Sequence, residues 1–117
     1  MGVDLKVLAS HFRERRGEFF ATATLRLDRD SGLFAQLAPD AEPRLVQPLP
    51  VGLKVGHHED DGLRWDEADR QGRPLTFTTP AELRRLRLPD DIAPWNRAVL
   101  AFLLALPPDA RIVLYWC

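Results

Sequence analysis

The chain has 117 residues, of which 45% are hydrophobic and 28% charged, and its formal net charge is −1. These values are those of an ordinary globular domain, which excludes a disordered chain or one embedded in a membrane. The near-neutral charge excludes a general electrostatic attraction to nucleic acid or to anionic lipid. The length predicts a single domain over residues 1–117.

The first predicted elements are two strands that pair as a hairpin. Val3, Leu5 and Val7 alternate with polar residues, as on a strand with one wet face. A second alternation gives one face to Phe19, Ala21, Ala23, Leu25 and Leu27. Half-buried strands of this kind favour antiparallel pairing, with the polar segment 11–17 as the connecting loop.

A short helix and a proline-rich segment are expected next. Asp30 or Ser31 can cap a helix that carries Leu33, Phe34 and Leu37, because either side chain accepts from the free amides of a first turn. Four prolines then lie between residues 38 and 50. Because proline disfavours a continuous helix or a central strand, we interpret 38–50 as a proline-rich crossing within the domain, either ordered or flexible.

The middle of the chain predicts a meander followed by a helix. Strands are expected at 51–55, 63–67 and 75–78, separated by turn-rich segments. The sequence Thr79-Pro80-Ala81-Glu82 is a capping box, in which the Thr79 hydroxyl accepts from the Glu82 amide and the Glu82 carboxylate reaches back to the Thr79 amide. It predicts a helix from Pro80 to residue 86 or 87.

The C-terminal third predicts a helix over 94–106 and a strand over 111–116. Pro94 can start the helix, and the prolines at 107 and 108 forbid its continuation. Apolar residues cover most of its circumference, which indicates burial on more than one side. The strand is apolar on both faces and is therefore expected in the interior of the sheet. The fold class that results is α+β: a mostly antiparallel sheet of about five or six strands, covered by the C-terminal helix and one or two short helices.

Residues 56–62, Gly-His-His-Glu-Asp-Asp-Gly, have the densest group of side chains in the sequence that could bind a metal ion. Adjacent histidines on an extended segment point to opposite faces, so His57 and His58 bind one metal only through an irregular turn. The spacings of a metalloprotease helix and of a calcium loop are both absent. We interpret the stretch as a solvated hairpin loop, with a metal site as the weaker alternative.

An acidic surface is expected to continue from this stretch to Asp69. Trp65 lies among its acids, where an exposed indole can hold a cationic partner through ring contact and charge. The alternative is that Trp65 packs in the core or at a sheet edge. The predicted partner-binding residues are His57, His58, Glu59, Asp60, Asp61, Trp65, Asp66 and Glu67.

Catalytic motifs are absent from the sequence. Neither Ser10 nor Ser31 lies in a nucleophile motif, and no glycine-rich phosphate loop exists. Arginines cluster at 13–16 and 84–87, but the balanced charge does not favour nucleic acid as a partner. We therefore predict no catalytic residue, no metal site and no cofactor.

The leading hypothesis is a small non-catalytic bacterial protein that binds or regulates a protein partner with a basic surface, in the manner of a partner-neutralising module. Fourteen arginines against two lysines are typical of a GC-rich bacterial genome. A cytoplasmic location is expected, because the single cysteine permits no internal disulfide and no apolar run reaches about 20 residues. A homodimer through the C-terminal helix is a further expectation. The alternative hypothesis is a metal-dependent hydrolase that uses the histidines and acids of 57–69.

Overall fold

The larger of two sheets has five strands. The computed structural model describes residues 3–117, and the strand order is β3-β1-β8-β7-β4. These strands are β1 (Leu5–Ala9), β3 (Ala23–Leu27), β4 (Gln47–Pro48), β7 (Thr76–Thr78) and β8 (Ile112–Trp116). All neighbours are antiparallel. The predicted pairing of the first two strands of this sheet is confirmed, with Leu5 opposite Leu27.

A smaller sheet has the order β2-β5-β6. Its strands are β2 (Glu18–Phe20), β5 (Lys54–Glu59) and β6 (Gly62–Asp66); β2 is parallel to β5, and β5 and β6 form an antiparallel hairpin. The strand predicted over 19–27 is therefore two strands in two sheets. The alternation of apolar residues continues through the break, but the residues before it and after it pack on opposite faces of the larger sheet.

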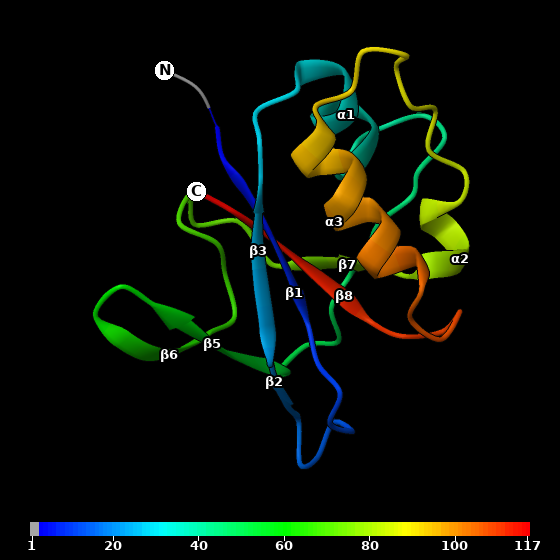
Figure 1. Ribbon diagram of the computed structural model, residues 1–117. Helices are drawn as coiled ribbons and strands as arrows, with labels where there is room; N and C mark the ends of the chain where they lie inside the picture. The colour runs from blue at the N-terminus through cyan, green and yellow to red at the C-terminus, as the bar shows by residue number, and fades with distance from the viewer. Residues whose placement is uncertain (1–2) are drawn as a thin grey trace.

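Three helices cover one face of the larger sheet, and the β5–β6 hairpin lies on its other side (Figure 1). The helices are α1 (Ser31–Leu37), α2 (Pro80–Leu83) and α3 (Pro94–Leu104). No helix among residues 3–117 is long and apolar enough to cross a bilayer. The molecule thus has three layers: helices, the five-stranded sheet and the three-stranded sheet.

Both predicted helix caps are confirmed. The Asp30 carboxylate accepts from the Leu33 amide at 3.0 Å, and the Thr79 hydroxyl accepts from the Glu82 amide at 3.3 Å. The reciprocal half of the capping box differs, because the Glu82 carboxylate bonds to the Arg85 guanidinium instead. Helix α2 also ends at Leu83, earlier than its pattern predicts.

A hydrophobic core lies on each side of the larger sheet. Strands β1 and β8 contribute to both cores, because successive side chains of a strand point to opposite faces. The core under the helices includes Leu5, Val7, Ile112 and Leu114. The core between the two sheets is formed by Leu8, Phe19, Ala21, Leu53, Val55, Leu75, Val113 and Tyr115. All five residues of β8 are buried, so its predicted interior position is confirmed.

The proline-rich crossing packs against the sheet. Leu45 and Val46 are buried, and the Leu45 carbonyl accepts from the Thr78 hydroxyl at 2.8 Å. Gln47 and Pro48 then form the edge strand β4, a position where a missing amide donor is tolerated.

Helix α3 forms where it was expected, but less of its circumference is buried than its apolar sequence predicts. Val99, Leu100 and Leu103 are buried, whereas Trp95 is 49% exposed and Phe102 is 43% exposed. The α+β class, the antiparallel sheet and the covering helices are confirmed. The strands are more numerous than predicted, because the covering layer on the far face of the larger sheet is itself a sheet.

Candidate functional site

The β5–β6 hairpin contains the stretch that the sequence singles out. Asp60 and Asp61 form a two-residue turn between the strands, and Gly62 begins β6 with a φ of 119°, a conformation that favours glycine. The hairpin prediction is right, but the extent of the loop is wrong. Gly56 to Glu59 belong to β5, because its strand pairing continues to the turn.

The two histidines lie on opposite faces of β5, as expected for an extended segment. Val55, His57 and Glu59 point to the inner face, toward the larger sheet, and Gly56 and His58 point to the outer face. The hairpin therefore has a buried inner face and a solvent-facing outer face, and each has its own chemistry.

The inner face holds a buried histidine between two acids. His57 is fully buried, its Nε2 lies 2.7 Å from Asp66 Oδ2, and its ring centroid lies 4.7 Å from that of Tyr115. A carboxylate can only accept, so Nε2 carries the proton of this hydrogen bond. The Nδ1 atom has no hydrogen-bond partner within residues 3–117 and lies 4.0 Å from Glu59 Oε1.

Glu59 joins this cluster to two cations. Lys6 Nζ donates to Glu59 Oε2 at 2.8 Å, and Arg70 Nη2 lies 3.3 Å from Oε1. Burial by itself raises the pKa of Glu59, but the positive charges of Lys6 and Arg70 outweigh it and hold that pKa below its ordinary value. Burial, together with the Asp66 carboxylate, raises the pKa of Tyr115.

The acids of the inner cluster each have partners within the chain. Glu59 lies between Lys6 and Arg70, and Asp66 bonds to His57. Among residues 3–117 no group of three or more His, Cys, Asp or Glu side chains is placed to hold a metal ion. Two cations beside the His57–Glu59 gap also oppose a third positive charge there. This geometry gives no support to the hydrolase alternative.

The outer face is aromatic. The Trp65 indole lies flat on Gly56, its cross-strand partner, so closely that a Cβ added to Gly56 would lie 2.8 Å from two ring carbons. The Phe20 ring centroid lies 6.2 Å from those of both Trp65 and His58, and that of Phe12 lies 6.5 Å from Phe20. We call the outer aromatic face the set Phe12, Phe20, His58, Leu63 and Trp65.

The outer aromatic face is open to solvent and bordered by acids. Phe12 is 57% exposed, Leu63 47% and Trp65 43%. Exposed Asp60 and Asp61 lie at the turn, and exposed Glu67 follows the other end of β6. None of these three acids forms an ion pair with another residue of the described chain. The hairpin side of the face thus combines apolar rings with unneutralised negative charge, whereas exposed Arg13 follows Phe12 at its other side.

The structure divides the predicted partner-binding residues between the two faces and the hairpin ends. On the inner side His57 is buried, and Glu59 and Asp66 are partly buried and bonded to other residues of the chain. Exposed toward the outer side or at the ends of the hairpin are His58, Asp60, Asp61, Trp65 and Glu67. The physical reason is the two-residue alternation of β5 and β6, which extends through Gly56 to Glu59, residues that were assigned to a solvated loop.

The sequence-based prediction missed Phe20 on the outer face and Lys6 on the inner face. Phe20 lies on the polar side of its alternation, beside Thr22 and Thr24, and an aromatic residue there signals a ring that is only partly buried. Lys6 lies on a strand face taken as wet. The apolar residues on both faces of 111–116 indicate that the sheet is covered on both sides, and this signal could have placed Lys6 under a second layer.

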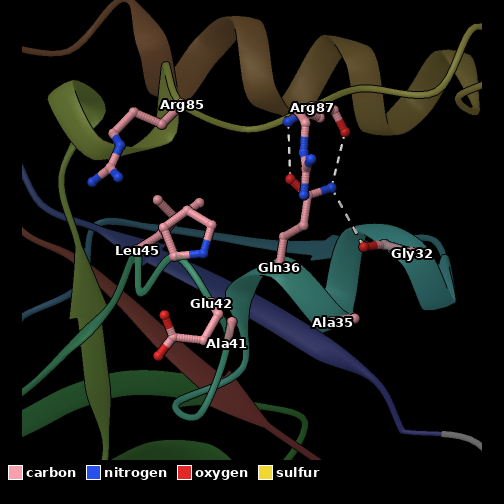
Figure 2. Close-up of a pocket in the computed structure, with 9 residues that line it drawn as sticks. Gly32, Ala35, Gln36, Ala41, Glu42, Leu45, Arg85 and Arg87 are labelled. Carbon is pink, nitrogen blue, oxygen red and sulfur yellow. Dashed lines mark hydrogen bonds between the residues drawn. The ribbon is translucent and has the colours of Figure 1, made fainter.

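A groove lies between α1 and the segment after α2 (Figure 2). It has a volume of about 330 Å³. The Gln36 side chain accepts from the Arg87 amide and donates to the Arg87 carbonyl, each at 2.9 Å. Arg85 pairs with Glu82 on its rim. Because these polar groups fasten the helical layer together, the groove does not present a convergent set of reactive groups.

Comparison with protein-family models, with curated proteins and with solved structures found no match to this chain.

Proposed function

We propose that the chain is a non-catalytic protein-interaction module that binds a basic surface of a partner protein through the outer aromatic face. One observation carries this proposal: His58 and the exposed Trp65 on the hairpin form one aromatic set with partly exposed Phe20 of β2 and exposed Phe12, and unpaired acids lie at both ends of the hairpin. Exposed apolar patches rimmed by polar residues mark protein–protein or membrane interaction sites and ligand-binding grooves.

The chemistry of the face suits a cationic partner. Aromatic rings supply most of the binding energy at protein interfaces, and their faces attract arginine and lysine side chains. Asp60, Asp61 and Glu67 add long-range attraction that accelerates encounter with a basic surface. The stacking of Trp65 on Gly56 holds the indole in place before binding, which lowers the entropy cost of association.

The inner cluster supports the face from below. His57 and Glu59 alternate along β5 with the residues of the outer face. The Lys6–Glu59 ion pair and the contact of the His57 ring with Tyr115 hold the hairpin against the larger sheet, and the His57–Asp66 hydrogen bond joins β5 to β6. In this proposal the protein acts by occupying its partner's basic surface, as a regulatory or neutralising module of the bacterial cytoplasm does.

A capture experiment with matched variants tests the proposal. Tagged wild-type protein is compared with Trp65→Ser and with Phe102→Ser in cross-linking pull-downs from source cells. Trp65 and Phe102 are equally exposed, at 43%, but Trp65 is in β6 and Phe102 is in α3, and these two elements lie on opposite sides of the larger sheet (Figure 1). We expect a basic protein that wild type and Phe102→Ser retain and Trp65→Ser loses.

Two results would contradict the proposal. One is a set of captured proteins that does not change in Trp65→Ser, with folding of that variant confirmed by circular dichroism. The other is retardation of single-stranded DNA or RNA at physiological salt that depends on Trp65. That outcome would assign the outer aromatic face to base stacking instead.

A further inference from the structure

The edges of the larger sheet are protected against pairing with another chain. On β3, the Trp95 indole N–H donates to the Arg26 carbonyl at 2.6 Å, and the Asn96 side chain bonds to both the amide and the carbonyl of Asp28. The opposite edge, β4, has only two residues, one of them Pro48. Side-chain cover, short length and proline are the usual devices that block edge pairing.

One edge of the smaller sheet is protected as well. On β2, the amide and the carbonyl of Glu18 both bond to Arg15 in the preceding turn, at 2.8 Å and 3.2 Å. Three of the four sheet edges thus carry a device against pairing.

The β6 edge carries no such device. In a two-residue hairpin the residues that flank the turn, Glu59 and Gly62, form a hydrogen-bonded pair, and bonded pairs then recur at every second position. His57 and Arg64 are therefore a bonded pair, whereas Leu63 and Trp65 direct their amides and carbonyls away from β5. No turn, cap or side-chain hydrogen bond reaches these outward groups within residues 3–117.

We propose that the β6 edge accepts an extended segment of the partner protein, which pairs with Leu63 and Trp65 as an added strand and carries basic residues at both of its ends. The inference rests on the proposed function and specifies how the partner docks. Main-chain hydrogen bonds supply affinity in this recognition mode, and alternate side chains supply specificity.

The order of residues along β6 predicts the pattern of the added strand. Leu63 and Trp65 share the outer face, and Asp61 and Glu67 lie two residues beyond them at either end. An added strand therefore places apolar side chains beside Leu63 and Trp65 and basic side chains beside Asp61 and Glu67. The pattern is basic, any, apolar, any, apolar, any, basic.

A second copy of this chain fits the edge poorly. Two-fold antiparallel pairing of β6 with itself, centred on Arg64, brings the two Arg64 side chains together and sets Asp61 of each copy beside Glu67 of the other. Like charges directly opposite each other destabilise a strand pair. In this register the charges thus favour a basic segment of a different protein over self-pairing.

A palindromic probe peptide tests the strand addition in either chain direction. Acetyl-Lys-Thr-Val-Thr-Val-Thr-Lys-amide is titrated into isotopically labelled protein, with amide exchange followed by nuclear magnetic resonance. We expect the exchange of the Leu63 and Trp65 amides to slow by roughly tenfold or more at saturation, because these amides become hydrogen-bonded, while that of Arg64 does not change. A peptide with glutamate in place of lysine is expected not to bind.

Backbone variants separate strand addition from simple side-chain contact. Two methylated peptides are compared. One carries N-methyl groups on both valine amides and the other carries them on the threonine amides, so the two peptides are blocked on opposite edges. We expect only one of these peptides to lose binding. In the protein, Leu63→Pro removes an outward amide without touching the bonds to β5, whereas Leu63→Ala keeps that amide. We expect Leu63→Pro to weaken binding at least about tenfold more than Leu63→Ala.

The outcomes distinguish the inference from the proposed function. Failure of the peptide to bind, binding without slowed exchange at Leu63 and Trp65, or equal effects of the paired variants would overturn strand addition. In each of these cases the proposed function would still be supported if a basic protein is captured in a Trp65-dependent way. Peptide binding with the expected exchange pattern, combined with captured proteins that do not depend on Trp65, would instead overturn the proposed function.

Discussion

Gly56 is the residue on which the shape of the outer aromatic face depends most directly. A Cβ at this position would lie 2.8 Å from two carbons of the Trp65 ring, closer than real Cβ contacts come. We predict that Gly56→Ala displaces the indole and lowers the free energy of unfolding by about 1–3 kcal/mol, the usual cost of overpacking. Thermal denaturation followed by tryptophan fluorescence measures both effects.

Gly32 provides the control for that substitution. It lies in helix α1, where an added Cβ would meet only the Asp30 carboxylate at an ordinary 3.6 Å. Because alanine favours a helix over glycine by roughly 0.5–1 kcal/mol, Gly32→Ala is expected to be neutral or stabilising. Equal destabilisation by the two substitutions would contradict the stacking argument for Gly56.

Glu59 makes stability depend on pH. Its pKa in the folded protein lies below the ordinary value of 4.5, so its ion pairs stabilise the fold above pH 4.5 and that contribution is lost as the pH falls through the folded pKa. We predict that Glu59→Gln costs about 1–3 kcal/mol at neutral pH, because Lys6 loses its ionic partner. The difference from wild type should narrow below pH 4.5 in urea titrations.

Glu67→Gln is the matched control for the pH experiment. Glu67 is exposed and, within the described residues, unpaired, so its substitution is expected to change stability by less than about 0.5 kcal/mol at any pH. A pH-independent difference between Glu59→Gln and wild type would show that the ionic contacts of Glu59 do not stabilise the fold.

At the scale of elements, Asn96 fastens helix α3 to the sheet. It is fully buried, and its amide group donates to the Asp28 carbonyl and accepts from the Asp28 amide, at 2.9 Å and 2.7 Å. Asn96→Ala leaves both backbone groups without these partners, so we predict a loss of about 1–3 kcal/mol in the free energy of unfolding. Arg97→Ala, on the exposed side of the same turn, should change it by less than about 0.5 kcal/mol.

Elements set by local chemistry were predictable from the sequence. The caps at Asp30 and Thr79 form as expected because each needs only a side chain and an amide three residues away. After helix α2 ends at Leu83, the amides of Arg85 and Leu86 bond to carbonyls three residues earlier, and the Arg87 amide bonds to Gln36 instead of continuing the helix. The change of sheet at residues 21 and 22 was not predictable, because the alternation of side chains is the same on either side of it.

The candidate site was also predictable only in part, because the alternation of side chains does not show which face of a strand is covered. Alternation correctly places His57 and His58 on opposite faces. Which face is buried depends on whether the hairpin lies over Lys6 and Tyr115, and that contact joins residues more than 50 positions apart. The sequence therefore located the hairpin but not its inner and outer sides.

At the scale of the whole molecule, two apolar surfaces lie on opposite sides. One is the outer aromatic face, and the other is a groove between α3 and β3 with a volume of about 340 Å³. The groove is lined by Ala23, Leu25, Trp95, Ala98, Val99 and Phe102. Two separate surfaces allow one copy to bind a partner at the hairpin and a second copy at α3.

Self-association through α3, expected from its apolar sequence, remains a prediction. Trp95, Ala98, Phe102 and Ala105 are all exposed and follow the spacing of a coiled-coil seam. The helix has only 11 residues, about 16 Å of length, so it cannot by itself bury the roughly 1,000 Å² that a stable dimer needs. We therefore expect a weak dimer that forms only at high concentration.

Light scattering across a concentration series tests this expectation. The mass should equal the monomer's 13.3 kDa at micromolar concentration and rise toward twice that value only near about 1 mM, where an association of roughly 4 kcal/mol becomes visible. Phe102→Glu places a charge at the centre of the seam and should hold the mass at the monomer value at every concentration. With Leu63→Glu, on the opposite side, the mass should rise with concentration as it does for the wild type. A mass that stays constant for the wild type would exclude α3 as a dimer surface and leave the hairpin as the apolar surface with a proposed partner.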